Sequence, residues 1–400
     1  MVLTSNSSWM GTTLGEILEI FDYKRIPLSG THRKESQGGY PYYGASGVID
    51  YIDDYIFDGR YLLIAEDGEN LNSRKLPVAF SASGKFWVNN HAHIVRAIPG
   101  IAEDYFIFAW FVQANISGYI TGAAQPKLTQ ENLKRIALRL PPLPTQRKIA
   151  AILSAYDNLF ENNTRRIRIL EEMAQAIYRE WFIHFRYPGH ENVSMVESEL
   201  GLIPEGWEVV RLGNLIEFKK GKKPNNYCLE DDIGSLPIFL IEGLNSGVTA
   251  FTSDKKLIIA EKDDVIMVMD GASSGKCYIR YYGALGSTLG RYRSINKSLL
   301  SPYHLFFTLD QNFRQISDNN TGAAIPHANK DFINQINILI PINDIRIQFH
   351  RIAENILLLR ENLRNRNINL CQQRDLLLSR LISGELDVSE LDIAVPEDVL

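Results

Sequence analysis

The sequence predicts an α+β protein in which two mixed α/β globular domains follow one another, separated by two long helices packed as an antiparallel coiled coil. Three observations lead to this fold class. The chain has 400 residues, which is more than one ordinary domain holds. Short motifs recur about 200 residues apart and in the same order. Each half also ends in a long stretch whose apolar residues are spaced as in a coiled-coil seam.

The repeat is visible at both ends of each half. A tryptophan followed by Leu-Gly opens each half, and a Thr-Gly-Ala-Ala-x-Pro segment lies near its end. The matching elements are Trp9…Leu14-Gly15 with Trp207…Leu212-Gly213, and Thr121–Pro126 with Thr321–Pro326. We therefore expect globular domains at residues 1–145 and 209–345. Short β-prone runs, such as residues 61–65 and 265–269, indicate that both domains combine strands with helices.

Residues 146–182 and 346–384 are predicted to form the two long helices. In the first, apolar residues follow one another at alternating steps of four and three, and only Asn163 breaks the row. In the second, Arg366 and Gln373 interrupt a similar row. At ~1.5 Å per residue each helix is roughly 50 Å long, and neither could keep an exposed apolar stripe in water. We expect the two helices to pair antiparallel; the alternative is that each folds back on its own globular half.

Proline and glycine punctuate the ends of these helices. The prolines at 141–144 and Pro341 mark where the helices cannot yet have begun, and Gly384 is expected to end the second one. Residues 183–208 are polar and interrupted by Gly and Pro, which is typical of a connector. Residues 385–400 hold six acidic residues and no Lys or Arg, so the formal net charge of −5 comes from this acidic tail. The charge balance therefore neither proves nor excludes a nucleic-acid partner.

The spacing of the cysteines and the distribution of apolar residues limit the classes of protein to which this chain can belong. The three cysteines are far apart and no two of them form a C-x-x-C motif, which argues against a disulfide framework and against a zinc site. The first residues lack the charged and apolar regions of a secretory signal, and no apolar run approaches the ~20 residues that span a bilayer. We expect a soluble, cytoplasmic protein without a membrane partner.

Catalytic motifs are incomplete. Residues 271–277 (GASSGKC) resemble a phosphate-binding loop, but only three residues separate the glycines and Cys follows the lysine, so the Mg²⁺-binding hydroxyl is missing. His91 and His93 could share a metal on one strand face, yet no third ligand is suggested nearby. Glu66-Asp67 and Asp270 suit turns better than a nuclease centre. We expect no catalytic residue, no metal and no cofactor on this chain.

Polar side chains on several loops are suited to DNA instead. Four lysines, at 219, 220, 222 and 223, lie on what looks like a flexible turn, which is either a solvated loop or a phosphate clamp. The amides and imidazole at residues 89–91 suit base-edge or phosphate contacts, or a structural role. The predicted DNA-binding residues are Tyr42, Tyr43, Lys85, Asn89, Asn90, His91, Gln125, Lys127, Lys219, Lys220, Lys222, Lys223, Lys276, His327 and Lys330.

These segments resemble one known family. Residues 40–71 (YPYYGASGVIDYIDDYIFDGRYLLIAEDGENL) and 78–95 (VAFSASGKFWVNNHAHIV) resemble a target recognition domain of type I restriction-modification specificity subunits. Residues 202–208 (LIPEGWE) resemble the start of a second such domain. Residues 141–149 and 379–384 (SRLISG) resemble the two ends of the family's helical spacers. The likeness covers nearly the whole chain and keeps its order.

The resemblance implies a bipartite reader of double-stranded DNA. Each recognition domain would read one half-site, and the helices would fix the gap and hold two methyltransferase (modification) subunits together with restriction (translocase and endonuclease) subunits. S-adenosylmethionine, ATP and Mg would then bind to those partners. Reading heads about one DNA turn (~34 Å) apart would lie on one face of the duplex. The alternatives are a stand-alone bipartite DNA-binding regulator and a degenerate nucleotide-dependent enzyme that binds ATP at Lys276.

Overall fold

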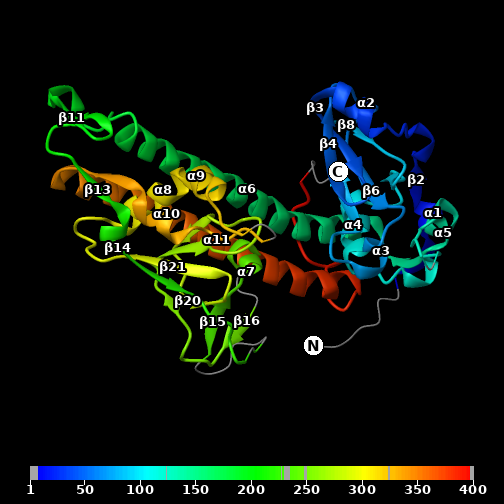
Figure 1. Ribbon diagram of the computed structural model, residues 1–400. Helices are drawn as coiled ribbons and strands as arrows, with labels where there is room; N and C mark the ends of the chain where they lie inside the picture. The colour runs from blue at the N-terminus through cyan, green and yellow to red at the C-terminus, as the bar shows by residue number, and fades with distance from the viewer. Residues whose placement is uncertain are drawn as a thin grey trace. The chain divides into compact units, whose positions relative to one another are not determined.

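Two units make up the computed structural model of this chain (Figure 1). The described residues are 8–122, 124–226, 228, 235–246, 250–322 and 325–396. Unit 1 comprises Met1–Glu161 and Asn369–Leu400, and unit 2 comprises Asn162–Ile368. Ala123, Ala323 and Ala324 of the repeated motif, and the last four residues of the acidic tail, lie outside the described residues. No helix in the described ranges is long and apolar enough to cross a membrane.

The globular part of unit 1 contains two four-stranded sheets. One has the strand order β2-β9-β6-β7 and the other β4-β3-β8-β5, while β1 pairs with β10. All pairings are antiparallel except that of β3 with β8. The strands are β1 Met10–Thr13, β2 Leu18–Ile20, β3 Gln37–Gly44, β4 Gly47–Ile52, β5 Phe57–Asp58, β6 Tyr61–Ala65, β7 Ala79–Ala82, β8 Lys85–Val88, β9 Ala92–Ala97 and β10 Ala137–Leu140. The helices are α1 Leu14–Ile17, α2 Gly30–Glu35, α3 Asn70–Ser73, α4 Asp104–Gln113 and α5 Gln130–Arg135.

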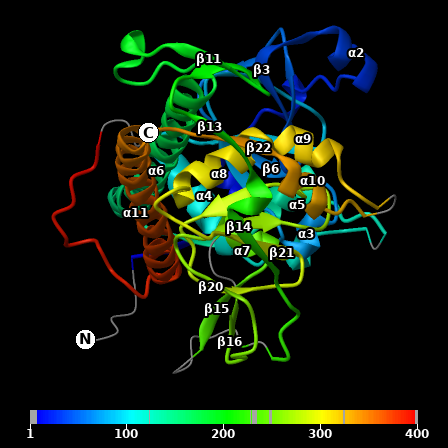
Figure 2. The same ribbon diagram turned by 60° about the vertical axis from the view of Figure 1, so that its left-hand side comes forward.

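Unit 2 repeats this topology strand for strand, and several of its strands, among them β14, β15 and β21, are labelled in Figure 2. Its sheets have the orders β14-β21-β18-β19 and β16-β15-β20-β17, β13 pairs with β22, and β15 with β20 is again the parallel pair. The strands are β13 Glu208–Arg211, β14 Ile216–Lys220, β15 Leu236–Phe239, β16 Ala250–Thr252, β17 Ile259–Ala260, β18 Val265–Val268, β19 Cys277–Ile279, β20 Gly283–Leu285, β21 Leu289–Ser294 and β22 Asn337–Ile340. The helices are α7 Ile241–Ser246, α8 Pro302–Gln311, α9 Phe313–Asp318 and α10 Lys330–Gln335, and a hairpin of β11 Met195–Ser198 and β12 Gly201–Pro204 precedes them.

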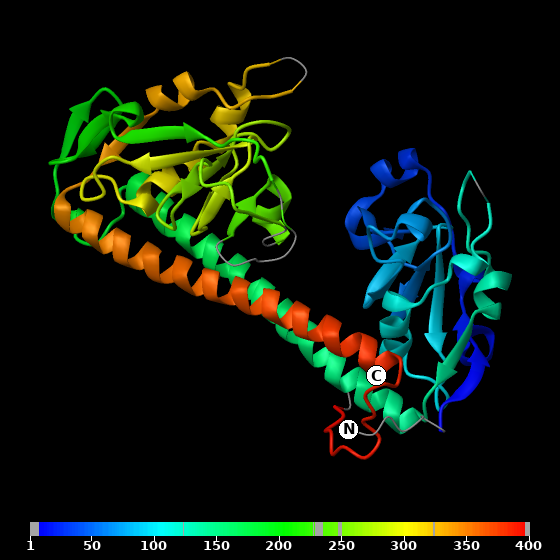
Figure 3. The same cartoon turned by 90° about the horizontal axis from the view of Figure 1, so that it is seen from below.

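Two helices of 40 residues each follow the globular parts, α6 Leu143–Phe182 and α11 Asn343–Ile382. In unit 1 the first half of α6 packs beside the last half of α11, and both enter one core through Ile149 and Leu381. In unit 2 the second half of α6 packs beside the first half of α11, where the ring centres of Phe182 and Phe349 lie 4.7 Å apart. The two helices run in opposite directions along each other (Figure 3), which confirms the predicted antiparallel pair.

Both helices begin before their predicted first residues, 146 and 346. Pro144 lies in the first turn of α6, where the prediction left no helix. A proline is tolerated there because the first N–H groups of a helix have no intrahelical acceptor in any case. At the other end, α11 stops at Ile382, and Gly384 adopts φ 76° while its N–H bonds the carbonyl of Leu381. The expected glycine stop is therefore present.

The apolar row expected for α11 is buried only in part: Phe349, Leu363 and Leu381 are at most 1% exposed. Ala353 and Leu357 are buried, whereas Ile352 and Leu359 are 36% and 42% exposed. Arg360 also lies on the buried face, and its guanidinium donates a hydrogen bond of 2.9 Å to a backbone carbonyl of β19. A seam that contains a paired arginine cannot be located by counting apolar residues alone.

A polar pair lies inside the helix interface of unit 2. Asn163, which breaks the apolar row of α6, donates its side-chain amide to Asn367 of α11 at 2.9 Å. Asn367 in turn donates to Thr164 at 3.2 Å, and both asparagines are less than 10% exposed. It is thus Asn367, and not the neighbouring Arg366, that faces the polar position of α6. A buried amide pair of this kind favours one register of two helices over its neighbours.

We predict that the amide pair behaves as a unit in stability measurements. Asn163→Leu should lower the free energy of unfolding by about 1–3 kcal/mol, because the buried side-chain oxygen of Asn367 loses the hydrogen bond from Asn163. The double variant Asn163→Leu, Asn367→Leu should recover most of that loss, since two apolar side chains then face each other. Urea denaturation followed by circular dichroism measures both. A double variant less stable than either single one would contradict the pairing.

The start of α6 is tied to the start of α4 through fully buried polar groups. Gln146 accepts a hydrogen bond from the Glu103 N–H at 3.0 Å and donates to the carbonyls of Ile101 and Pro141. The Glu103 carboxyl caps α4 by accepting the Phe106 N–H at 2.7 Å through Oε2. Its Oε1 has no partner among the described residues, and burial raises the pKa of Glu103 to about 7.

The raised pKa of Glu103 predicts a pH-dependent stability of unit 1. Between pH ~4.5 and ~7 the folded protein holds a proton that the unfolded chain releases, so stability should fall as pH rises through this window. Glu103→Gln keeps the cap and should remove up to about 3 kcal/mol of that fall between pH 5 and pH 8. Urea midpoints measured at several pH values test this. Glu69→Gln, at an exposed glutamate, is the control and should leave the profile unchanged.

Candidate nucleic-acid interface

The repeated Thr-Gly motif forms the same loop in both units. In unit 1, Thr121 and Lys127 exchange both backbone hydrogen bonds, at 2.8 and 2.7 Å; in unit 2, Thr321 and His327 do so at 2.9 and 2.8 Å. Gly122 has φ 86°, and a Cβ there would lie 2.3 Å from the Gln125 carbonyl oxygen. Gly322 is in the same situation. The glycine is therefore required by the loop itself. We call the described residues of 121–127 and of 321–327 the repeated loops.

Each repeated loop is fastened to an Asp-Gly turn at the end of a buried strand. In unit 1 the N–H of Gly68 bonds the Pro126 carbonyl at 3.0 Å, and the N–H of Leu128 bonds the Glu66 carbonyl at 2.7 Å. In unit 2 the same two bonds are made at 2.9 and 2.8 Å by Gly271 with Pro326 and by Ala328 with Met269. This backbone frame puts Asp67 and Asp270 at equivalent positions of the repeat.

Both aspartates hold an exposed histidine. His91 Nδ1 lies 2.8 Å from Asp67 Oδ2, and His327 Nδ1 lies 2.7 Å from Asp270 Oδ1. The histidine side chains are each 47% exposed, while the aspartates are 16% and 18% exposed. We call these the two Asp–His pairs. They join two residues that the sequence marked as DNA contacts, His91 and His327, to the Asp-Gly turns.

Lysines complete the charge balance at each turn. In unit 2, Lys220 lies 3.0 Å from Asp270; in unit 1, Lys127 lies 3.2 Å from the neighbouring Glu66. Partial burial alone would raise the pKa of Asp270, but its bonds to His327 and Lys220 outweigh burial and lower it. Asp270 is thus a carboxylate at neutral pH. At both turns, lysine and histidine side chains are exposed to solvent, and each histidine is held by a less exposed aspartate.

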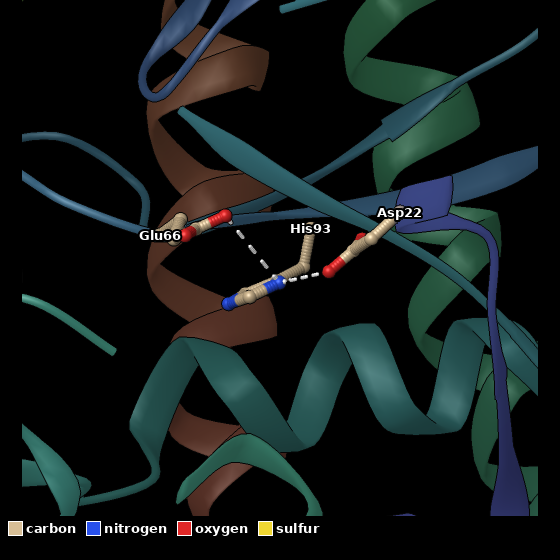
Figure 4. A group of neighbouring side chains, drawn as sticks. All are labelled: Asp22, Glu66 and His93. Atoms are coloured by element: carbon tan, nitrogen blue, oxygen red, sulfur yellow. Dashed lines mark hydrogen bonds and ion pairs between the residues drawn. The ribbon is translucent and has the colours of Figure 1, made fainter. Parts of the chain in front are cut away.

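A buried ionic network supports the turn of unit 1 (Figure 4). His93, 1% exposed, lies with Nδ1 2.6 Å from Asp22 Oδ2 and Nε2 2.7 Å from the Leu128 carbonyl. Both partners are acceptors, so only an imidazole with a proton on each nitrogen satisfies them. Arg25 Nη1 lies 2.5 Å from Glu66 Oε2. Burial alone would raise the pKa of Asp22 and Glu66, yet bonds to His93 and Arg25 hold both below their usual range.

The side chains of this network could also be considered as metal ligands. Asp22, Glu66 and His93 offer ligand atoms within 4.8 Å of one another. Both carboxylates already have partners in the protein. Glu66 is paired with the Arg25 guanidinium, and Asp22 accepts hydrogen bonds from the Ile94 N–H and from Gln130. The residues therefore fit a structural ion network that anchors the base of the repeated loop. His91 and His93, considered above as a metal pair, face two different carboxylates.

Of the two predicted tyrosine contacts, Tyr42 is part of the core, which corrects the prediction for that residue, whereas Tyr43 is only partly buried. Tyr42 is 1% exposed, its hydroxyl accepts the Leu28 N–H at 3.0 Å, and its ring packs in a core cluster. Tyr43 packs against Phe80 and Phe86, and burial raises its pKa. Aromatic residues beside a turn look similar in sequence whether they face solvent or the opposite sheet.

The remaining predicted contacts of unit 1 fall into two groups. Asn89 is 6% exposed, and its side chain accepts the His91 N–H at 2.8 Å, so it shapes the turn rather than facing solvent. Asn90 and Gln125 are exposed. Lys85 is exposed and its ammonium lies 4.4 Å from the centre of the Tyr55 ring. The exposed ones stay candidates for contact with a ligand.

The lysine-rich segment of unit 2 is not the flexible turn that the sequence indicated. Lys219 and Lys220 belong to strand β14 and form ion pairs of 3.0 Å with Glu217 and Asp270. Gly221 follows in a confined position, where a Cβ would lie 2.2 Å from a backbone oxygen of Gly286. Lys222 and Lys223 are exposed, and neither ammonium forms an ion pair with any described residue. These two are the lysines of the segment that suit a phosphate.

The phosphate-loop-like segment is a closed turn. The N–H groups of Ser274, Gly275 and Lys276 bond the carbonyls of Gly271, Val268 and Ser273 at 2.8–3.0 Å. Those donors are consequently not available to cradle a phosphate. The Lys276 ammonium lies 5.3 Å from the Tyr278 ring centre, and that of Lys330 lies 5.4 Å from the Phe218 ring centre. Both lysines are exposed cations beside an aromatic ring.

Sequence reasoning missed the residues that position the site. Asp67 and Asp270 were assigned to turns, and Arg25 and Asp22 were not singled out. A signal was present for the aspartates, because the repeat itself aligns the two Asp-Gly turns. No such signal marked Arg25 and Asp22, because their partners Glu66 and His93 lie far along the chain and meet them only in the folded unit.

Comparisons with known proteins agree with this layout. The family model of the type I restriction modification DNA specificity domain matches residues 6–172 and again 204–357. The chain is 26% identical to the type I restriction enzyme MjaIX specificity subunit of Methanocaldococcus jannaschii, over 95% of this chain and 96% of that one. It is 31% identical to the EcoprrI specificity subunit of Escherichia coli over 41% of this chain and 39% of that one. A crystal structure of the type I restriction-modification S subunit of M. genitalium, 16% identical, superposes with a TM-score of 0.63 over 96% of this chain and 98% of that one.

Proposed function

The chain belongs to the type I restriction-modification DNA specificity family, and from that premise we propose that its two units each read one half of a bipartite DNA site. The observation that carries this is the duplicated surface: two units of one topology each bear a repeated loop and an Asp–His pair at equivalent positions. Two similar reading surfaces in one chain suit a split recognition sequence better than a single continuous one. The chain itself contributes recognition and not catalysis, as in the family to which it belongs.

We assign the exposed residues around the turns to DNA contact. Histidine, amide and lysine side chains there can donate or accept hydrogen bonds to bases, or pair with phosphates. The assigned residues are Lys85, Asn90, His91, Gln125, Lys127, Lys220, Lys222, Lys223, Lys276, His327 and Lys330. Lys219 faces Glu217 and contributes at most through the local charge. Such a site works on duplex DNA in the cytoplasm.

We further propose that the helix pair carries the partner subunits. Two modification subunits would supply S-adenosylmethionine and methylate the DNA, and restriction subunits would add ATP- and Mg-dependent translocation and cleavage. Apolar side chains on the outer faces of the helices support a protein partner there. The most exposed of them are Leu159, Ile169 and Met173 of α6 and Leu359 and Leu376 of α11, at 42–71% exposure.

Exchange of one domain tests the proposed function. Replacing residues 209–345 with the corresponding domain of another family member should change one half of the methylated sequence and leave the other half intact. The reason is that the core of each unit is closed by its own strands and helix segments. Methylated positions are mapped in DNA from cells that carry the matching modification subunits. The reciprocal exchange of residues 1–145 is the control and should change the opposite half; a change in both halves would refute the proposal.

Neutralising the unpaired lysines should weaken binding without changing sequence preference. Lys222→Ala with Lys223→Ala removes two exposed ammonium groups that suit phosphate contact, so cognate and non-cognate duplexes should lose affinity alike. The slope of log affinity against log salt should decrease by about 0.9 for each phosphate that is no longer neutralised. Lys297→Ala removes a lysine that is paired with Asp263 at 2.8 Å and serves as the control. A loss confined to cognate DNA would assign these lysines to base contacts instead.

A further inference from the structure

The two Asp–His pairs are built from different parts of the repeat. In unit 1 the histidine, His91, lies on the turn between β8 and β9, and its backbone carbonyl accepts the Glu66 N–H; in unit 2 Thr288 takes that backbone role toward Met269. In unit 2 the histidine, His327, closes the repeated loop, where unit 1 has Lys127. Equivalent aspartates therefore receive an imidazole by two different routes. A shared need for an imidazole at that position explains this better than inheritance of one residue.

The aspartate determines which ring nitrogen carries a proton. A carboxylate can only accept, so the Nδ1 of His91 and the Nδ1 of His327 must each donate across their distances of 2.8 and 2.7 Å. In a neutral imidazole with Nδ1–H, the other nitrogen, Nε2, carries a lone pair. In the described part of the chain neither Nε2 has a hydrogen-bond partner. Each pair thus presents a single acceptor of fixed orientation on a half-exposed side chain.

The charges near the unit 2 pair do not require a cationic histidine. Asp270 already lies 3.0 Å from the Lys220 ammonium, so one carboxylate and one lysine balance before the imidazole is counted. In unit 1 the lysine at the turn, Lys127, pairs with Glu66 and leaves Asp67 to His91. Charge balance therefore favours a neutral imidazole that accepts at Nε2 in unit 2, whereas in unit 1, where Asp67 pairs with His91, that form of the ring is part of what is tested below.

We propose that the Asp67–His91 and Asp270–His327 pairs are specificity-determining. Each would accept, through histidine Nε2, a hydrogen bond from an exocyclic amino group in the major groove. Only adenine, through N6, and cytosine, through N4, offer a donor there, whereas guanine and thymine offer acceptors. Each pair therefore selects adenine or cytosine at one position of its own half-site. This inference rests on the proposed function and names the chemical group that the reading surface recognises.

The proposal is tested by deleting the amino group and the histidine in turn. Once the half-sites are known from methylation mapping, duplexes are made with purine in place of each adenine, or 2-pyrimidinone in place of each cytosine, one position at a time. At one position per half-site the wild-type chain, in complex with its modification subunits, should lose binding by about 5- to 150-fold, as for a good base contact. His91→Ala should lose a similar factor on unmodified DNA and be indifferent to the analogue at that position.

Two further variants sharpen the test. Asp67→Asn can donate from its amide to Nδ1, which moves the imidazole proton to Nε2 and turns the acceptor into a donor. At the same base pair its preference for adenine or cytosine should therefore fall. Asp270→Asn and His327→Ala should behave alike in the other half-site only. His184→Ala, at an exposed histidine that follows α6 outside both turns, should change nothing.

The outcomes separate this inference from the proposed function. If losses from His91→Ala and from the amino-group deletion multiply at every position, the histidine does not contact an amino group and the inference is overturned. Equal weakening of all duplexes by His91→Ala and His327→Ala would overturn it too, since it indicates phosphate contact. If wild-type binding is indifferent to sequence in either half, the proposed function itself fails.

Discussion

The packing of α6 against α11 is the constraint on which both units depend. A globular part of this size presents one face of its core to a helix, and the long helices cover that face in each unit. In unit 1 the cover comes from Ile149 and Leu153 of α6 with Leu378 and Leu381 of α11. In unit 2 it comes from Trp181 of α6 and from α11 residues that begin at Ile345 and include Phe349. A helix with one apolar stripe gains its stability from such burial and not from propensity alone.

Polar contacts then decide how α11 sits on unit 2. Arg280, whose φ of 69° is unusual for a residue other than glycine, reaches Glu361 of α11 at 2.6 Å and the Tyr303 hydroxyl at 2.7 Å. Lys262 bonds the same carboxylate at 2.7 Å. Burial alone would raise the pKa of Glu361, but these cations hold it below its usual range. Apolar packing holds the helix to the sheet with little preference along its axis, and paired charges of this kind supply that preference.

The sequence was enough to predict the architecture of this structure, but it was not enough to predict the burial and the partners of individual side chains. The duplicated motifs and the helical period were enough for the tandem domains and the antiparallel pair, because both follow from local spacing. The exact buried face of α11 was out of reach, since Arg360 and Asn367 occupy it through partners elsewhere in the fold. Tyr42 was misjudged for the same reason: the groups that bury its ring are brought together only by the folded sheets.

The repeat also explains why the contact residues were harder to predict than the scaffold. The backbone bonds that fasten each loop to its Asp-Gly turn are the same in both units, and they need only glycine, proline and aspartate at fixed places. Those residues are duplicated in the sequence. The side chains on top are not: Lys127 stands where unit 2 has His327, and Thr288 stands where unit 1 has His91. Under the proposed function the two units read different half-sites, so a shared frame has to carry unlike surface residues. The proposed contact residues of the two units therefore correspond by their positions in the backbone and not by residue type.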